Sequence, residues 1–296
     1  MMALLAILVI HAALGQAPMT EPEHAANPVY QALRTEGFQA EGATATFPEP
    51  ILHDGQTADA QRAACIEVAG SEQALDDLLR NSVTAPFKLK IRNIESKHGV
   101  IRAVDLWFAV HTSLDEIKPD DMSGREARKG AAEVGNMRFE GRLLTVDELK
   151  SRGLTAVDKN ERYFYSNSLL LDRIGVETTS RTFASRSEES FVAASRTSLK
   201  FDADPEFPNR WRAITRRDGR DEIGSSKPYA GGASYVKVSP LKFKPGTLLV
   251  EVHAAFDEPK AWFDGAPILR SKISLVAQDR IRELRREIAK RRKSAK

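Results

Sequence analysis

Alternating apolar and polar residues along the chain predict the strands of an antiparallel sheet. In the range 86–91 apolar residues alternate with Lys and Arg, which is typical of a strand with one buried face. The range 100–111 has the same period, with Val, Leu and Phe on one face and Asp105 and His111 on the other. Further strands are expected on either side of turns, one of them the hairpin turn 187–190: 163–171, 175–186, 191–201, 211–217, 235–238 and 247–256.

Apolar residues spaced three and four positions apart predict helices in two regions. The first region is 57–80, where Gly70 is expected to divide the helix and Ser71 to cap the second piece. The second region follows Pro259 and continues to the end of the chain, with an apolar stripe opposite a basic face: Ile273, Ala277, Ile281, Leu284 and Ile288. We therefore expect an α+β fold in which an antiparallel sheet packs against a long C-terminal amphipathic helix.

The beginning of the chain predicts an export signal followed by a linker. Residues 1–15 form a short apolar run that ends in small residues, which is typical of a secretory signal peptide and too short for a membrane span. A buried N-terminal strand or helix is the alternative. Proline recurs through 16–50, which indicates an extended arm or linker. The range 51–296 is expected to form a single α+β domain with an irregular polar insertion near 118–141.

Composition and charge refine this picture. A hydrophobic content of 42% and a charged content of 29% are ordinary for a globular protein. Cys65 is the single cysteine, so no intramolecular disulfide can form, and an exported chain of this kind fits a bacterial periplasmic or secreted protein. The range 279–296 is strongly basic, which suggests peripheral contact with an anionic envelope surface. No nucleic-acid recognition motif accompanies it, so nucleic acid is not expected as a partner.

The sequence contains few patterns that are typical of a metal, cofactor or catalytic site. The histidines have no metal-ligand spacing, and no phosphate-binding glycine loop occurs, so we expect neither a metal nor a cofactor. Asp105 and His111 share one strand face, and Glu251 and His253 share another. If these two strands are neighbours, the four residues could supply a general base with an orienting carboxylate. The alternative is that they are polar positions without a catalytic role, and enzymatic activity is left open.

The C-terminal stretch from Leu248 to Ile288 combines a long apolar strand, a bend, the pair Trp262-Phe263 and an amphipathic helix. This succession resembles the end of the helix-grip fold of the START-like superfamily, in which a curved antiparallel sheet wraps a long C-terminal helix. The resemblance implies a cavity between helix and sheet that binds lipids or other apolar molecules. Functions in that superfamily range from carriers to cyclases and hydrolases, so the resemblance does not specify a reaction.

Three hypotheses about function follow. The first is noncatalytic binding of an apolar or amphipathic small molecule between the sheet and the C-terminal helix. Aromatic residues would line the pocket and an arginine would hold a polar head group: Trp107, Tyr235, Trp262 and Phe263, with Arg181 or Arg196. The second is a secreted hydrolase that uses one of the His–carboxylate pairs. The third is an interaction or scaffolding protein of the envelope that uses its basic C-terminus.

Overall fold

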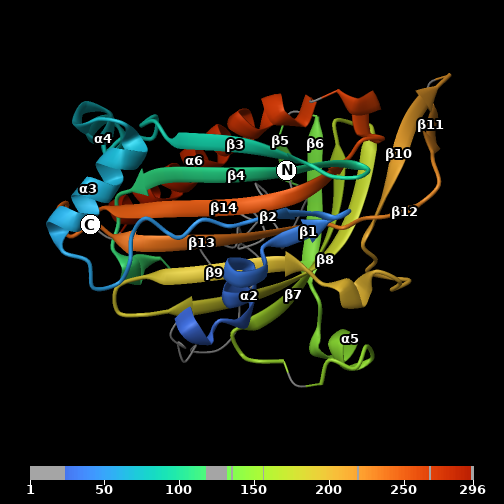
Figure 1. Cartoon of the computed structure of the whole chain (residues 1–296), viewed down its shortest axis with the longest axis horizontal. Helices are drawn as coiled ribbons and strands as arrows, with labels where there is room; N and C mark the ends of the chain where they lie inside the picture. The colour runs from blue at the N-terminus through green and yellow to red at the C-terminus, as the bar shows by residue number, and fades with distance from the viewer. Residues whose placement is uncertain are drawn as a thin grey trace.

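The computed structural model describes residues 24–117, 132–134, 136–155, 157–218, 220–266 and 268–294. An antiparallel sheet and a long C-terminal helix, α6 (Ile268–Ser294), dominate these residues, which confirms the predicted α+β class (Figure 1). Most strands of the sheet follow one another in a single path: β3 (Lys88–Glu95), β4 (Gly99–Val110), β14 (Leu248–Pro259), β13 (Gly232–Pro240), β9 (Phe191–Thr197), β8 (Ile174–Arg186), β7 (Glu161–Leu170), β6 (Met137–Leu143) and β5 (Ala132–Val134).

Strand β14 is the last strand of the chain, yet it occupies a central place between β4 and β13. It pairs with β4 along its whole length, from Leu248 opposite Val110 to Pro259 opposite Gly99. Off this path, the first residues of β8 pair with β10 (Arg210–Arg217). Strands β11 (Arg220–Ile223) and β12 (Lys227–Pro228) pair with β10, and the β10–β11 hairpin projects from the body at the upper right of Figure 1.

Helix α6 covers one face of the central strands. Its buried residues lie in a single hydrophobic core with residues of β4 and β14: Leu269, Ile273, Val276, Ala277 and Ile281 pack with Val104, Phe108, Val250 and Val252. The predicted C-terminal helix and its apolar stripe are thereby confirmed. No helix among the described residues combines the length and the apolar character that a bilayer crossing needs.

Two further helices lie on the opposite face, α3 (Ala58–Ala69) and α4 (Glu72–Leu78). They were expected as one divided helix, and the division falls where predicted. Gly70 ends α3 in a left-handed conformation with φ +98°, and the Ser71 side chain accepts a hydrogen bond from the Ala74 N–H to cap α4. Their apolar residues pack on this second face with Trp107 of β4 and Leu249 of β14.

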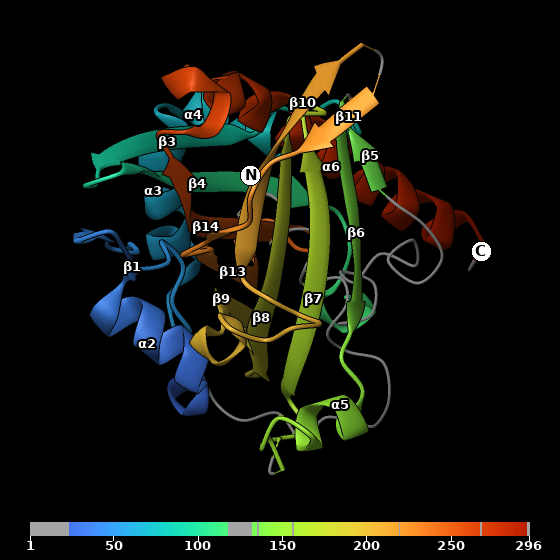
Figure 2. The ribbon, with the colours of Figure 1, turned by 90° about the vertical axis from the view of Figure 1, so that its right-hand side faces the viewer.

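The range predicted as a linker is folded onto the sheet from residue 24 onward. It contains η2 (His24–Ala26), α2 (Pro28–Glu36), β1 (Phe38–Ala40) and β2 (Ala43–Ala45), and we call residues 24–56 the N-terminal segment. Figure 2 shows that α2 and α6 lie on opposite sides of the sheet. The prolines of this range, which was predicted as an extended arm or linker, do not prevent packing. Pro28 occupies the first turn of α2, where it is tolerated, and apolar residues of the segment are buried against the sheet: Val29, Leu33, Phe38 and Phe47.

The predicted irregular insertion also differs in part. Residues 118–131 and 135 lie outside the described residues, as do the predicted signal peptide and the rest of the range 1–23. The later part of the insertion forms β5 and β6, and β6 pairs with β7. Met137 and Phe139 are buried in the main core, which explains why this polar stretch is a strand with one apolar face. A short helix, α5 (Val146–Lys150), follows and begins with a capping box of Thr145 and Glu148.

Candidate functional site

The strands that carry the predicted His–carboxylate pairs are neighbours, as the hypothesis required. Asp105 of β4 lies opposite His253 of β14, and Asp105 Oδ1 is 2.8 Å from His253 Nδ1. Glu251 lies two residues before His253 on the same face, and its Oε2 atom is 3.9 Å from His253 Nε2. The imidazole therefore lies between two carboxylates, one from each strand.

This group is buried beneath the N-terminal segment, although Asp105 also forms an ion pair of 3.4 Å with the half-exposed Arg92. His253 and Glu251 are 0% exposed, and the rings of Trp107 and Tyr235 lie 5.4 and 4.8 Å from the His253 ring. Burial alone would lower the pKa of His253, but the hydrogen bond with Asp105 and the negative charges of Asp105 and Glu251 raise it above its usual value. A general base must reach the reacting atoms of a substrate, and this imidazole has no exposed surface from which to do so.

Glu251 also holds the N-terminal segment against the sheet. Its carboxylate accepts hydrogen bonds from the backbone N–H groups of Ile51 and Leu52, at 2.9 and 3.2 Å, and from Trp107 Nε1 at 3.1 Å. The Tyr235 hydroxyl adds a bond of 2.6 Å to the carbonyl oxygen of Pro48. Glu251, predicted as a catalytic candidate, and Tyr235, predicted to line a pocket, therefore hold the segment in place, and Trp107 supports the Glu251 carboxylate.

His111, the fourth catalytic candidate, is separate from this group. Its Nδ1 atom is 3.2 Å from Thr247 Oγ1, and its Nε2 atom has no hydrogen-bond partner. Burial lowers its pKa, the Arg80 backbone acts in the opposite direction, and the charges of nearby Lys and Arg residues lower the pKa further. The structure thus pairs Asp105 with His253 and leaves His111 outside the pair.

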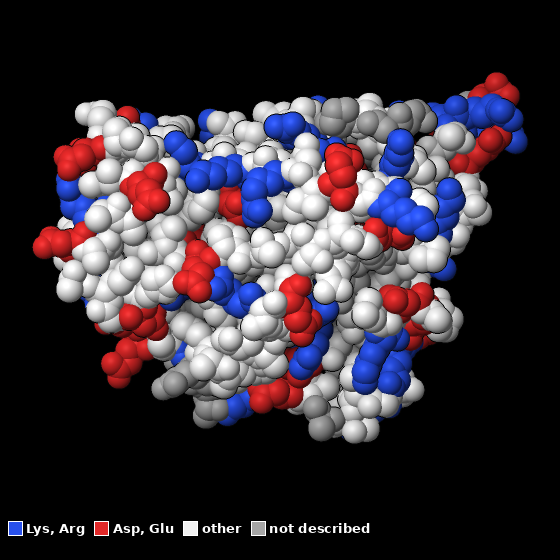
Figure 3. All heavy atoms as spheres, in the orientation of Figure 1, with Lys and Arg blue, Asp and Glu red and all other residues white. Residues whose placement is uncertain are grey.

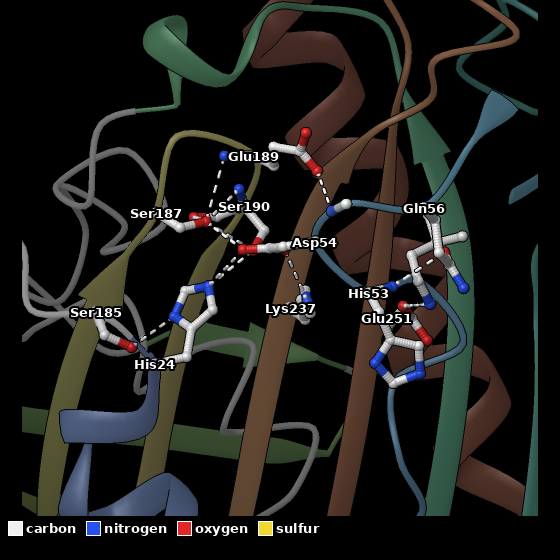
Figure 4. A network of polar contacts seen from close by, with 12 residues as sticks. His24, His53, Asp54, Gln56, Ser185, Ser187, Glu189, Ser190, Lys237 and Glu251 are labelled. Atoms are coloured by element: carbon white, nitrogen blue, oxygen red, sulfur yellow. Dashed lines mark hydrogen bonds and ion pairs between the residues drawn. The ribbon is translucent and has the colours of Figure 1, made fainter.

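A second polar network forms around Asp54, farther along the same face (Figure 4). Asp54 accepts hydrogen bonds from Ser187 Oγ at 2.5 Å, Ser190 Oγ at 2.7 Å and Lys237 Nζ at 3.2 Å. The two serines lie at the β8–β9 turn, and Lys237 comes from β13. Although burial would raise the pKa of Asp54, these hydrogen bonds and the Lys237 charge lower it to about 2. Asp54 is consequently a carboxylate at neutral pH.

His24 joins this network at the beginning of the described chain. Its Nδ1 atom is 2.9 Å from Ser185 Oγ, and its Nε2 atom is 2.7 Å from Ser190 Oγ. Burial and the Lys237 charge lower the pKa of His24 to about 4, so the imidazole is neutral at pH 7. Ser, His and Asp are all present, but Asp54 binds Ser190 rather than orienting His24, and Ser190 is fully buried. The arrangement lacks the exposed nucleophile of a hydrolase.

Two pockets open along the edges of the N-terminal segment. The first, which we call the Asp54 pocket, has a volume of about 110 Å³ and lies between the segment, α3, the β8–β9 turn and the end of β13. Most of its lining residues have polar or charged side chains, and Pro240 adds apolar surface: His53, Asp54, Gln61, Glu188, Glu189, Ser239, Pro240 and Lys242.

The second, which we call the Arg196 pocket, has a volume of about 230 Å³ and lies between the end of α2, β1 and the end of β9. Its lining mixes apolar, polar and charged groups: Glu36, Gly37, Phe38, Gln39, Arg196, Thr197, Leu199, Ala230 and Gly232.

The two predicted head-group arginines are neighbours across the β8–β9 pair. Arg181 lies directly opposite Arg196 in the antiparallel register. Arg181 Nε is 2.6 Å from Glu161 Oε1, whereas Arg196 Nη1 is 3.4 Å from Glu36 Oε2. Arg196 lines the pocket named after it, and Arg181 does not line that pocket. Of the two, Arg196 is therefore placed to meet a ligand.

The four predicted pocket aromatics do not converge. Trp107 and Tyr235 face the N-terminal segment, while Trp262 and Phe263 belong to the core on the α6 side. The predicted common pocket is wrong for this set, because the alternation of strand residues places β4 position 107 and β13 position 235 on the face opposite α6. Trp262 instead packs with Tyr229, Trp211 and Phe263, at ring separations of 5.4, 6.0 and 6.4 Å.

Several residues of this face were not predicted from the sequence. Lys237 lies two residues after Tyr235 in β13. Because residues two positions apart in a strand share a face, the period of the strand could have placed Lys237 on this face. His24, Asp54 and the serines of the β8–β9 turn lie far apart in the chain, up to 166 residues in the case of His24 and Ser190. No local pattern connects them, and only the docking of the N-terminal segment brings them together.

Comparisons with protein families and with curated proteins found no relative of this chain. No model of a protein family matches the chain, and no curated protein matches it significantly. Within the described part of the chain, no group of three or more His, Cys, Asp or Glu side chains could hold a metal ion. What the face can do chemically must therefore be argued from its two pockets.

Proposed function

We propose that this protein is a noncatalytic binding protein for a small amphipathic anion, which it holds in the Arg196 pocket. The observation that carries the proposal is the state of the Arg196 guanidinium. Among the described residues its hydrogen-bonded partner is Glu36, at 3.4 Å, and the arginine side chain remains 36% exposed on the pocket wall. Several of its N–H donors are free for a carboxylate or phosphate, which an arginine binds with strong, directed hydrogen bonds.

The rest of the lining suits the apolar part of such a ligand. Phe38 and Ala230 contribute apolar surface, and Leu199 at the rim is 68% exposed. An exposed leucine beside a pocket offers a contact for an alkyl chain. Basic and acidic side chains alternate over this side of the molecule (Figure 3), so recognition would rest on the pocket itself rather than on a broad field of one sign.

The polar groups of the pocket support binding rather than catalysis. The Thr197 hydroxyl donates to the Gly232 carbonyl oxygen at 3.1 Å and accepts from the Gly232 N–H at 2.9 Å. It is therefore occupied by backbone partners and has no neighbouring base to activate it. This proposal keeps the expected ligand class and places it on the face covered by the N-terminal segment instead of beside α6.

A titration with hexanoate tests the proposal, with hexanol and hexylammonium as probes of the same chain length. We expect hexanoate to bind and Arg196→Gln to weaken it about 10-fold or more, because a charged hydrogen bond contributes ~1.5–3 kcal/mol. Arg181→Gln is the matched control and should leave the affinity unchanged. Equal binding of hexanol, or equal loss with Arg181→Gln, would show that Arg196 does not recognise the anion.

We propose peripheral contact with an anionic membrane surface as a second function, carried by the outer side of α6. Lys272, Arg282 and Arg286 make no ion pair within the described residues, and Leu275 beside them is 52% exposed. Basic side chains next to an apolar one suit the head-group region of an anionic bilayer. For an exported bacterial protein, which the predicted signal peptide implies, such a surface would belong to the cell envelope.

Cosedimentation with vesicles tests this second function. We expect binding to vesicles that contain anionic lipid, loss of binding at high salt, and loss in the double variant Arg282→Glu/Arg286→Glu. The double variant Arg216→Glu/Arg217→Glu carries the same charge change on the projecting hairpin and should bind normally. If both double variants lose binding equally, net charge rather than the α6 surface is responsible.

A further inference from the structure

We propose that the Asp54 pocket is a second binding site, and that it takes the ammonium group of a small amine. This site is independent of the Arg196 pocket, with which it shares no lining residue. The pocket is about 110 Å³, whereas a single water needs only ~10–15 Å³ on the same measure. It therefore has room for a small organic group.

An unpaired hydroxyl provides the first argument for a ligand. Ser239 lines the pocket from the end of β13, its side chain is 4% exposed, and its Oγ atom has no hydrogen-bond partner. Buried hydroxyl groups in native proteins are nearly always paired, and an exception calls for an explanation. A ligand with an N–H donor in the pocket would give Ser239 the missing partner.

The balance of charges gives the second argument and the sign of the ligand. Three carboxylates line the pocket, and two of them are already paired with lysines. Asp54 is paired with Lys237 at 3.2 Å and Glu189 with Lys242 at 2.9 Å. Glu188 is exposed and makes no ion pair within the described residues. The surplus negative charge favours a cation over a neutral or anionic ligand.

The walls of the pocket are fixed by bonds between segments that are distant in sequence. Glu189 Oε2 accepts from the Gly55 N–H at 2.6 Å, and Gln61 Oε1 accepts from the Lys242 N–H at 2.8 Å. These bonds join the β8–β9 turn to the N-terminal segment and α3 to the residues after β13. A preformed pocket binds at a lower entropic cost than one that must be ordered by its ligand.

An NMR titration with propylammonium tests this inference. We expect saturable shifts of the amide signals of Gly55, Glu188 and Ser239, and binding that is at least 10-fold tighter than that of propanol or propionate. Glu188→Gln, a change at an exposed position, should weaken propylammonium several-fold. Glu36→Gln removes a carboxylate from the Arg196 pocket and should leave the titration unchanged.

Ser239→Ala gives an independent test with two opposite effects. In the free protein the substitution removes an unpaired buried hydroxyl, so the melting temperature should rise or stay the same. Binding of propylammonium should nevertheless become weaker, because the ligand loses an acceptor. The inference is overturned if propanol or propionate binds as well as the amine, or if no shifts appear at 50 mM amine. It is also overturned if Ser239→Ala and Glu188→Gln leave amine binding intact.

Discussion

Buried ionisable residues of this protein differ in whether the surrounding residues stabilise their charged or their neutral form. His253 has a carboxylate on each side and a hydrogen bond to one of them, Asp105, whereas Asp257, four residues further along β14, has no basic partner among the described residues and an Oδ1 atom without a hydrogen bond. Burial and the charges of Glu41 and Glu258 raise the pKa of Asp257 to about 7. The two residues therefore lie on one strand with opposite requirements, since His253 needs its charged partners and Asp257 needs its proton.

Replacing His253 should destabilise the protein strongly. His253→Ala would leave the buried carboxylates of Asp105 and Glu251 without their shared partner, and we expect a loss of about 3–5 kcal/mol in the free energy of unfolding. Urea denaturation measures this loss. His111→Ala is the control at a half-buried histidine with a single hydroxyl contact, and its cost should be clearly smaller. Equal costs would mean that the carboxylates do not depend on the imidazole.

Asp257 should make stability depend on pH. Because its folded pKa is above that of an unfolded carboxyl, the folded state retains a proton between about pH 4 and 7, and stability falls as pH rises through this window. The loss is at most about 4 kcal/mol, at 1.36 kcal/mol per pKa unit. Asp257→Asn should remove this part of the pH dependence in unfolding measured at pH 5 and pH 8. An unchanged difference between the two pH values would rule out this role.

Among the elements, α6 is held to the sheet by one buried arginine as well as by its apolar stripe. Arg285 Nε donates to the Ala109 carbonyl oxygen at 3.0 Å, and Nη1 donates to the Ala85 carbonyl oxygen at 2.5 Å. Burial lowers the pKa of Arg285 to about 10, which still leaves it charged at neutral pH. The guanidinium thereby joins the helix to the end of β4 and to the segment before β3.

A conservative exchange at this position should be costly. Arg285→Lys keeps the charge but cannot donate to these carbonyl groups in the same fork geometry, so we expect a loss of about 2 kcal/mol in unfolding free energy. The neighbouring Arg286→Lys, at an exposed position, should change stability by less than about 0.5 kcal/mol. Similar effects of the two exchanges would show that the Arg285 hydrogen bonds contribute little.

Elements with a strong local period were predicted from the sequence, and those defined by distant partners were not. The alternation in β3 and β4, the β8–β9 turn and the stripe of α6 all reflect neighbours within one element, so local spacing was sufficient. The docking of the N-terminal segment depends on Glu251, 200 residues beyond Ile51, and no local pattern records such a contact. For the same reason the sequence indicated the Asp105–His253 face but not the two pockets beside it.

Across the whole molecule, the central strands of the sheet are covered on both faces, whereas the projecting β10–β11 hairpin is exposed to solvent at β11. Strands β4, β13 and β14 are almost entirely buried, whereas all four residues of β11 are exposed. The free energy of local opening should therefore be lowest at the projecting hairpin and highest in the central strands.

Hydrogen exchange should show this gradient directly. Amides of β14 should exchange only through global unfolding, while those of β11 should exchange fastest among the strands. Arg285→Lys should raise the exchange rates of β4 and β14 in step with its effect on global stability. Exchange in β14 as rapid as that in β11 would mean that the cover provided by the N-terminal segment and α6 is not stable in solution.

The central place of β14 also has a consequence for how the chain folds. β4 and the N-terminal segment are synthesised early, but both have their partners on β14. Asp105 of β4 pairs with His253, and Ile51 of the segment binds Glu251. Until β14 is synthesised, β4 has only β3 beside it, and its apolar face is not covered by α6. A topology dominated by such long-range contacts is expected to fold slowly and late, after nearly the whole chain has been made. If residues 1–15 act as the export signal predicted from the sequence, such a delay would keep the chain competent for translocation.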